Sequence, residues 1–394
     1  MPAQPTPIYL DHNATTPIDP GVREAMMPFL VDQFGNPSSL HSFGMKAAQA
    51  VEHARQQVAE LLECRSDELI FTSGGTESSN LAILGTLLTS ESAASSHVIS
   101  SAIEHPATHA PLQAVKKLGC TVSIVGCDAT GIISPEAIEA AIQPHTKLVS
   151  IMHANNEIGT IQPIHEIAHI CRASGILFHV DAAQTVGKLP VSCRELGVDL
   201  LTVAGHKFYA PKGIGCLFIR HGVELNGLLH GGGQEGGLSP GTENVPHIVA
   251  LGQAAKIARQ RCAQDSMQMS GLRDQLEALL TEKTGGAILI HAQTAQRLSN
   301  TTSIAFPDVQ ANAILDQIPF LCASTGAACH SHATTISATL QAIGVTESVA
   351  QGTIRISLGR HTTEDEIDRA ATALALAWEK SRKLGSAFPP HQGL

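Results

Sequence analysis

Aromatic residues, clusters of basic residues and long apolar runs are scarce in this chain of 394 residues. Aromatic residues make up only 3%, so we expect a core built mainly from Ala, Ile, Leu and Val. The net charge is −10 and Lys and Arg form no cluster, which argues against nucleic acid and an anionic membrane surface as partners. No apolar run approaches the roughly 18 residues of a membrane-spanning helix.

The sequence also offers neither a disulfide framework nor a secretion signal. The nine cysteines are odd in number and irregularly spaced. Residues 1–7 lack the basic and apolar regions of a signal peptide. With 43% hydrophobic and 15% charged residues, the composition is that of an ordinary globular protein. We therefore expect a cytoplasmic protein in a reducing environment.

Short β-rich runs alternate with helical stretches between about residues 68 and 220. This alternation predicts right-handed βαβ crossovers and a mainly parallel sheet. The expected strands are 68–72, 98–101, 121–125, 148–152, 177–180, 200–203 and 215–219. Helices are expected at 80–88, 138–142 and 164–173.

A long helical stretch over 248–284 leads into a second α/β unit at roughly 264–380. The expected strands of this unit are 287–290, 301–305 and 353–358, and its helices are 336–343 and 364–384. The chain is long enough for about two domains of ordinary size.

Two of the expected strands stop abruptly at polar residues, one at Asp181 and the other just before Lys207. Ligands of open parallel sheets bind at the carboxyl ends of strands. A lysine and a carboxylate there suit pyridoxal phosphate (PLP), since the lysine forms a Schiff base and the carboxylate pairs with the pyridine nitrogen. Gln184 lies in the same turn, within reach of a ring hydroxyl. The simpler alternatives are a helix cap for Asp181 and a solvated Lys207.

Two further segments suit the same cofactor. The glycine-rich turn before Thr76 follows a strand and opens a helix, a place where backbone N–H groups bind phosphate. It matches no nucleotide-binding motif, and an ordinary turn with a Thr cap is the alternative. His105 ends another strand, where an imidazole could stack on a ring and carry protons. Among 20 histidines, a surface or capping role is the alternative.

Cys329 and Arg355 stand out in the second unit. Cys329 lies among small residues beside His330 and His332, a setting that favours the reactive thiolate. The spacing fits no standard zinc site, so we expect no metal. Arg355 alternates along a strand, and its guanidinium suits an α-carboxylate; a surface salt bridge is the alternative.

Taken in order, these segments resemble the PLP-dependent cysteine desulfurases of the NifS/IscS type, which have the class V aminotransferase fold, and the closely similar selenocysteine lyases. The matching segments are 9–17, 34–37, 72–77, 104–105, 155–157, 181–184, 205–207, 241–244, 326–329 and 355–360. The resemblance covers nearly the whole chain. It implies the α/β fold of PLP-dependent transferases of fold type I, with a mainly parallel central sheet. A large PLP-binding domain would span 16–263, and a smaller α/β domain with the Cys329 loop would span 1–15 plus 264–394.

The resemblance also implies roles for single residues. Those for the cofactor are Lys207 as its covalent holder, His105 stacked on the ring, Asp181 at the pyridine nitrogen, Gln184 at the phenolic oxygen, and Gly75, Thr76 and His206 at the phosphate. Thr242 would reach the phosphate from the other subunit of a homodimer. Those for the substrate are Asn156 and Arg355 at its carboxylate, with Asn13 in the substrate site, and Cys329 as sulfur acceptor.

The implied reaction converts L-cysteine to L-alanine and leaves the sulfur as a persulfide on Cys329, from which an acceptor protein takes it. Iron–sulfur cluster assembly, tRNA thiolation and selenium supply are all compatible destinations. The alternatives are a selenocysteine lyase and a catalytically silent sulfur-transfer scaffold. Pro106 after His105, where animal selenocysteine lyases tend to have Asp, favours cysteine.

The chain departs from the family pattern around the phosphate and near Cys329. Ala204 replaces a common Ser, and Gly236 and Ser239 stand where arginines are common. The segment after Cys329 lacks the usual Pro-Ser.

Overall fold

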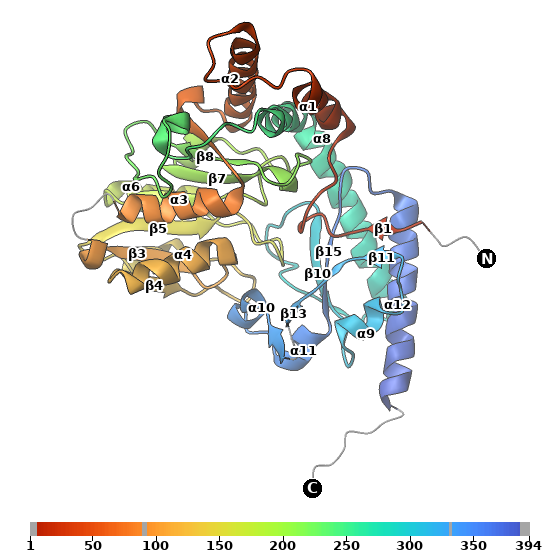
Figure 1. The fold of residues 1–394 in the computed structure, drawn as a ribbon. Coiled ribbons are helices and arrows are strands. Elements are labelled where there is room, and N and C mark those ends of the chain that lie inside the picture. The colour runs from red at the N-terminus through yellow and green to blue at the C-terminus, as the bar shows by residue number, and fades with distance from the viewer. Residues whose placement is uncertain (1–5, 89–92, 331–332, 387–394) are drawn as a thin grey trace.

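The computed structural model describes residues 6–88, 93–330 and 333–386. Its largest sheet has seven strands in the order β2-β8-β7-β6-β5-β3-β4 (Figure 1). Only β8 runs antiparallel to its neighbours, so the predicted mainly parallel sheet is confirmed. The strands are β2 (Leu69–Thr72), β3 (His97–Ser101), β4 (Thr121–Val125), β5 (Thr146–Met152), β6 (Leu177–Asp181), β7 (Leu200–Ala204) and β8 (Gly215–Ile219).

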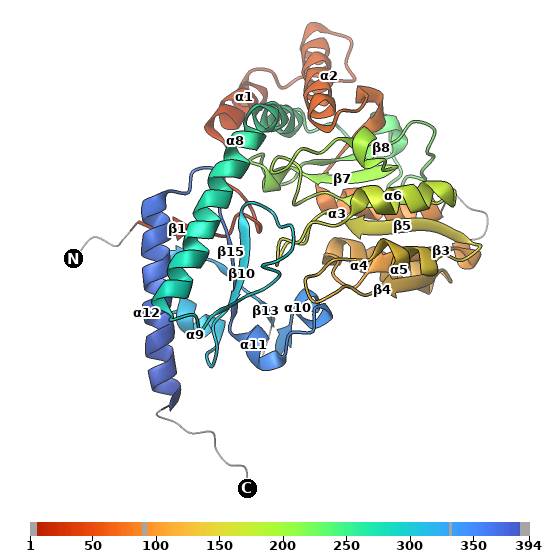
Figure 2. The ribbon, with the colours of Figure 1, turned by 180° about the vertical axis from the view of Figure 1, so that it is seen from behind.

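Hydrophobic side chains cover both faces of this sheet, as a buried parallel sheet requires. Leu148 and Val149 are neighbours in β5 but belong to different cores, because successive side chains of a strand point to opposite faces. The helices on the Leu148 side are α3 (Gly75–Leu87) and α4 (Pro106–Lys117); those on the Val149 side are α5 (Pro135–Ala140) and α6 (Ile164–Ala173), with α6 in front of the sheet in Figure 2.

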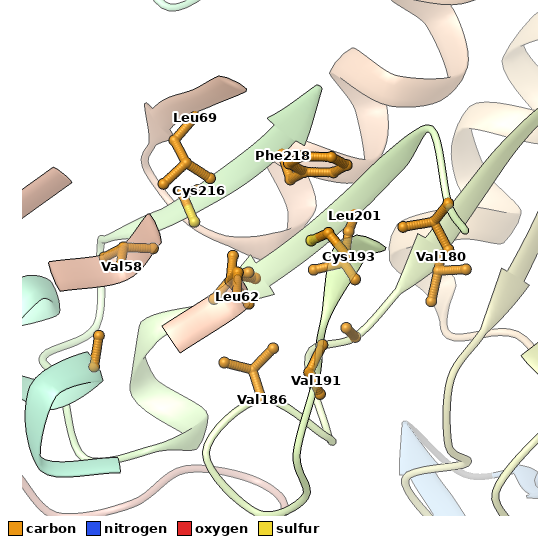
Figure 3. Packing of buried hydrophobic residues seen from close by; sticks show 14 of the residues in the cluster. Val58, Leu62, Leu69, Val180, Val186, Val191, Cys193, Leu201, Cys216 and Phe218 are labelled. Atoms are coloured by element: carbon orange, nitrogen blue, oxygen red, sulfur yellow. The ribbon is translucent and has the colours of Figure 1, made fainter. Parts of the chain in front are cut away.

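Cysteines fill part of the core below helix α2 (Ser42–Leu62). Figure 3 shows Cys193 and Cys216 among Val58 and Leu62 of α2 and the strand residues around them. Burial raises the pKa of both thiols, which keeps them protonated and unreactive. These two cysteines therefore serve as small hydrophobic residues, as the sequence predicts.

Helix α8 (Val245–Lys283) connects the two halves of the molecule. Its first half packs against α1 (Pro20–Val31) and α2, and its second half packs against α12 (Glu364–Ser386) (Figures 1 and 2). The side chain of Asn244 caps its start by accepting a hydrogen bond from the backbone N–H of His247. The predicted helix over 248–284 is confirmed and begins three residues earlier.

The second half contains a four-stranded antiparallel sheet in the order β12-β15-β10-β9. The N-terminal strand β1 pairs with β11, which ties the start of the chain to this half. The strands are β1 (Ile8–Tyr9), β9 (Leu289–Ile290), β10 (Thr301–Ala305), β11 (Leu321–Cys322), β12 (Ser324–Thr325) and β15 (Thr353–Ser357). The short helices are α7 (Cys193–Leu196) in the first half and α9 (Ala311–Leu315), α10 (Ala338–Ala342) and α11 (Glu347–Gln351) in the second.

The predicted helix over 336–343 is wrong at its start. Ile336 is the last residue of β14 (Ala333–Ile336), which pairs with β13 (Ala327–His330) in a hairpin. The helix begins only after Ser337, whose hydroxyl accepts a hydrogen bond from the N–H of Leu340 as its N-cap. The run Thr-Thr-Ile before Ser337 is β-branched and favours the extended strand.

Two hydrophobic cores lie on either side of the predicted domain boundaries. One is drawn from residues 22–258, and the other from residues 8–10 and 272–378. The boundaries themselves stay a prediction. Within the described ranges, no helix is long and apolar enough to cross a membrane.

Candidate active site

A cavity of about 220 Å³ opens at the carboxyl ends of β5, β6 and β7. Residues at the starts of α3 and α4 also line this cavity. The lining residues are Gly75, Thr76, His105, Ala107, Met152, Ala154, Asn156, Asp181, Ala183, Gln184, Ala204, His206 and Lys207. This edge of an open α/β sheet is where ligands bind. The structure thus brings together most of the residues that the sequence assigns to the cofactor.

Lys207 reaches the cavity from a 3₁₀ turn directly after β7 (η3, Gly205–Lys207). Its Nζ donates hydrogen bonds to the backbone carbonyls of Asn13, at 2.6 Å, and Ala14, at 2.9 Å. Burial, and next the charge of Arg355, lower the pKa of Lys207 to about 8. A lysine with such a pKa has an appreciable neutral fraction near physiological pH, and the neutral amine is the nucleophile.

Asp181 ends strand β6, and its side chain is 7% exposed. Its Oδ1 accepts a hydrogen bond from the N–H of Ala183 at 3.0 Å, the one hydrogen bond that this carboxylate makes with the described residues. Burial raises the pKa of Asp181, while that hydrogen bond and the charges of His105 and Lys207 act in the opposite direction. A carboxylate so sparsely paired would gain from a cationic partner in the cavity. Asp181 is thus both a turn cap and a cavity residue.

His105 is the N-cap of α4. Its Nδ1 accepts a hydrogen bond from the N–H of Ala107 at 3.1 Å, which assigns the proton of the neutral ring to Nε2. His105 is solvent-exposed and lines the cavity, and partial desolvation of the ring lowers its pKa. The capping role and the cavity role therefore occur together, because the cap fixes the ring over the cavity.

The N-terminus of α3 forms one end of the cavity and continues into a hollow that Lys212 also lines. Gly75 and Thr76 begin this helix and present free backbone N–H groups, which suit a phosphate. A Cβ added to Gly75 would lie 3.2 Å from the Cβ of Ala204, so the close approach favours glycine there. The Nδ1 of His206 forms a hydrogen bond with the hydroxyl of Thr15 at 3.2 Å. Burial is the main cause of the lowered pKa of His206, which is about 4.

Arg355 contacts Asn156, which is one of the residues that line the cavity. Its Nη1 donates to the carbonyl of Asn156 at 3.2 Å, and its Nη2 donates to Asp11 at 2.7 Å and to the hydroxyl of Ser324 at 2.9 Å. Its Nε is buried and has no hydrogen-bond partner among the described residues. Arg355 is therefore ion-paired, as in the alternative from sequence, and it contacts the cavity residue Asn156 while one of its donors is unused.

Asn13 is buried behind the cavity and does not line it. Its Nδ2 donates to Thr301 at 2.8 Å and to the carbonyl of Asn156 at 3.2 Å. Its Oδ1 accepts from Lys188 at 2.9 Å and from Asn300 at 3.1 Å. Since these contacts use the whole carboxamide, Asn13 joins the N-terminal segment to both halves of the molecule.

Thr242 lies away from this cavity, in a second hollow beside Ser239 and Glu235. The loop that carries Thr242 has no arginine at positions 236 and 239, and other hydrogen bonds hold it in place. Glu235 accepts hydrogen bonds from Arg55, the shorter at 2.6 Å, and from the N–H of Phe71 at 2.7 Å. The hydroxyl of Ser239 donates to Glu77 at 2.9 Å. These bonds anchor the loop within its own chain.

Cys329 lies in strand β13, opposite Thr334 of β14. Its side chain and that of His330 fall outside the described part, as does His332 altogether. Among the side chains that the structure does describe, no three of His, Cys, Asp or Glu are grouped to hold a metal ion. The roles of Cys329 and of the histidines beside it stay predictions.

Glu104 is a buried acid that the sequence analysis left without a role. Its Oε1 accepts from the hydroxyl of Ser101 at 2.6 Å and from the N–H of Met152 at 2.9 Å. Its Oε2 is buried without a hydrogen-bond partner in the described protein. Burial raises the pKa of Glu104 to about 8. An acid directly before His105, after an apolar strand, is the signal that could have identified it.

The chain matches a family model and curated relatives over nearly its full length. The model for aminotransferase class-V matches residues 8–370. A cysteine desulfurase IscS of Dictyoglomus turgidum is 41% identical over 379 residues, which are 96% of this chain and 96% of the relative. A cysteine desulfurase of Nostoc sp. is 43% identical over 379 residues, 96% of this chain and 94% of the relative.

Solved structures agree with these relatives. A NifS-like protein superposes with a TM-score of 0.87 at 36% identity, over 97% of this chain and 100% of that chain. SspA in complex with cysteine gives 0.79 at 35% identity, over 90% of this chain and 99% of that chain. These likenesses confirm the predicted α/β fold of PLP-dependent transferases of fold type I. The chain belongs to the aminotransferase class-V family, whose members include the PLP-dependent cysteine desulfurases.

Proposed function

We propose that this chain is a PLP-dependent cysteine desulfurase, which converts L-cysteine to L-alanine and passes the sulfur through a persulfide on Cys329 to an acceptor protein. One observation carries the proposal. The amine of Lys207 and the carboxylate of Asp181 face one cavity in a chain 41% identical to a cysteine desulfurase over 96% of its length. Most lysines and aspartates of soluble proteins are exposed to solvent. A lysine and an aspartate that face the same cavity at the sheet edge therefore indicate a binding or catalytic role.

The residues of the cavity fit PLP. Asp181 is a sparsely paired buried carboxylate, which suits a protonated pyridine nitrogen. Gly75 and Thr76 offer helix N-terminal N–H groups for the phosphate, and the methyl of Ala204 packs where a hydroxyl is common. His105 is a neutral ring that can stack on the cofactor, and Lys207 can hold it covalently. When bound, PLP supplies an electron sink for a carbanion at the substrate Cα.

The protein supplies binding and proton transfer. The guanidinium of Arg355 and the amide of Asn156 would hold the substrate carboxylate. Lys207, with a pKa of about 8, accepts the Cα proton in its neutral form. Asp181 would act as an ionised carboxylate beside the pyridine ring, because a neutral acid would not keep the ring nitrogen protonated.

Cys329 completes the reaction. Its thiolate attacks the substrate sulfur, an S–S bond forms and the Cβ–S bond breaks. The electron pair of the broken bond remains on the substrate carbon, which takes up a proton and yields alanine. A position in a hairpin suits a thiol that must meet both the cavity and an acceptor.

A homodimer is part of this proposal, because Thr242 does not reach the cavity of its own chain. Exposed large hydrophobic residues are concentrated between residues 18 and 45, which supports a second copy covering this region. They are Ile18, Met27, Leu30, Val31, Phe34, Leu40, Phe43 and Met45. Sedimentation of the PLP-loaded protein is expected to give a dimer, and a monomer at micromolar concentration would contradict this part.

Alanine formation tests the proposal. The PLP-loaded protein is expected to release alanine from L-cysteine, whereas Cys329→Ala and Lys207→Ala are expected to release none above background. Alanine at the Cys329→Ala level in the wild type would reject a desulfurase. A scaffold without catalysis would also lack the absorption band of lysine-bound cofactor. The ratio of kcat/KM for L-selenocysteine and L-cysteine separates a lyase from a desulfurase.

A further inference from the structure

Lys188 is a buried lysine behind the cavity that no step above uses. It follows β6 by a few residues, and only 5% of it is exposed. Its Nζ donates to the side-chain oxygen of Asn13 at 2.9 Å and to that of Gln184 at 2.8 Å. No carboxylate of the described residues lies within ion-pair distance, and the nearest charges acting on Lys188 are the cations of Lys207 and Arg355.

This arrangement is costly for the fold alone. Burying a cation without an acid partner loses hydration, and amide oxygens replace it only in part. Desolvation and the two neighbouring cations lower the pKa of Lys188 for the same reason. A methionine of similar length would fill the space without this cost, so packing does not account for a lysine here.

The two hydrogen bonds set the direction of an amide that lines the cavity. The Nζ of Lys188 is the donor in both contacts, so Gln184 turns its Oε1 toward Lys188. Its Nε2 then points away and donates one hydrogen bond to the carbonyl of Asn13 at 3.0 Å. The second hydrogen of Nε2 has no acceptor among the described residues. Gln184 therefore offers a donor, and not an acceptor, to a ligand in the cavity.

We propose that Lys188 is a positioning residue for the cofactor, which fixes Gln184 so that its NH₂ group faces the phenolic oxygen of PLP. The proposal rests on the proposed PLP site. Without Lys188, Gln184 could turn and present its oxygen, which repels a phenolate.

The test compares cofactor binding in Lys188→Met with the wild type. The variant is expected to bind PLP about tenfold more weakly, measured by equilibrium dialysis. The pH midpoint of the visible band of bound cofactor is expected to rise by about one unit, because Gln184 no longer holds its NH₂ donor toward the phenolate. The other charged groups that face the cavity, Asp181, His105, His206 and Lys207, are unchanged in this comparison.

A double-mutant cycle with Gln184→Ala separates positioning from a purely structural role. Lys188→Met is expected to shift the midpoint little when Gln184 is already absent, and to leave the melting temperature of the cofactor-free protein at or above that of the wild type. A full shift in the Gln184→Ala background, or a wild-type midpoint in Lys188→Met, overturns the proposal. Should Lys188→Met not fold, Lys188→Leu takes its place with the same expected rise in midpoint, and a wild-type midpoint again overturns the proposal.

The result is distinguishable from failure of the proposed function. A wild type that shows the cofactor band and makes no alanine refutes the desulfurase alone, since the Lys188 shift is measured without substrate. A wild type that makes alanine while Lys188→Met keeps its midpoint and affinity refutes the role of Lys188 alone. A wild type that binds no PLP refutes both.

Discussion

The amine of Lys207 is expected to titrate near pH 8 in the cofactor-free protein. An ordinary lysine titrates near 10.5, and the difference makes the neutral amine about 300-fold more abundant at pH 7. Burial is the main cause, because it disfavours the charged form; the charge of Arg355 adds to it, and Asp181 and Asp11 oppose it. The pKa of Lys207 thus reports the electrostatics of the whole cavity.

Competitive labelling measures this pKa directly. The cofactor-free protein reacts with a trace of acetic anhydride at pH values from 6 to 11, together with a free lysine derivative as reference. Mass spectrometry of the Lys207 peptide then gives its relative reactivity at each pH. A midpoint near 8 is expected, and Lys207→Ala locates the signal.

Two variants test the assigned causes. Arg355→Gln removes a neighbouring cation and is expected to raise the midpoint of Lys207. Asp181→Asn removes a carboxylate that favours the ammonium and is expected to lower it. A wild-type midpoint above 10, or shifts of the opposite sign, would refute the electrostatic description of the cavity.

Three further outcomes follow from other contacts. Asp181→Asn is expected to lower kcat for alanine formation by about 100-fold, because the ring loses its charged partner, and a wild-type kcat would exclude that role. Arg360→Met leaves the buried Asp265 with Arg261 as its one arginine partner and removes the arginine paired with Asp19, so it is expected to cost about 3 kcal/mol of stability, seen as a lower melting temperature. Arg65→Ala at an exposed pair is expected to cost under about 1 kcal/mol. Glu104 loses its proton near pH 4.5 when unfolded and near 8 when folded, so the wild type is expected to lose stability as pH rises between these values, by up to about 5 kcal/mol. Glu104→Gln is expected to flatten that melting-temperature profile, and an unchanged slope would contradict the raised pKa.

The sheet and the cavity were predictable because their signals are local. Apolar strands that end at Asp181 and before Lys207 mark the carboxyl edge of a parallel sheet, and the order of the strands places both residues there. The cysteines of the core were predictable from their apolar neighbours in the same way. The assigned roles of the individual residues stay predictions.

The contacts that could not be predicted join residues far apart in the chain. Asn13 contacts Ser357, 344 residues away, and Lys207, 194 residues away. No periodicity encodes such pairings. The burial of Lys188 depends on them, so it was equally invisible in the sequence. The predicted helix start at residue 336 was wrong because β-branched residues precede the helix there. The pairing of β14 with β13 decides in favour of a strand, and this pairing is a tertiary contact.

Sulfur transfer to Cys329 is the central claim, and the mass of the intact protein after reaction tests it most directly. The PLP-loaded protein is incubated with L-cysteine, the excess is removed, and the mass and peptide map are recorded before and after reduction. We predict the gain of one sulfur atom, mapped to Cys329, lost on reduction and absent in Cys329→Ala and Lys207→Ala. Alanine formed with no sulfur on Cys329, or sulfur found only on another thiol such as the exposed Cys322, would contradict the account.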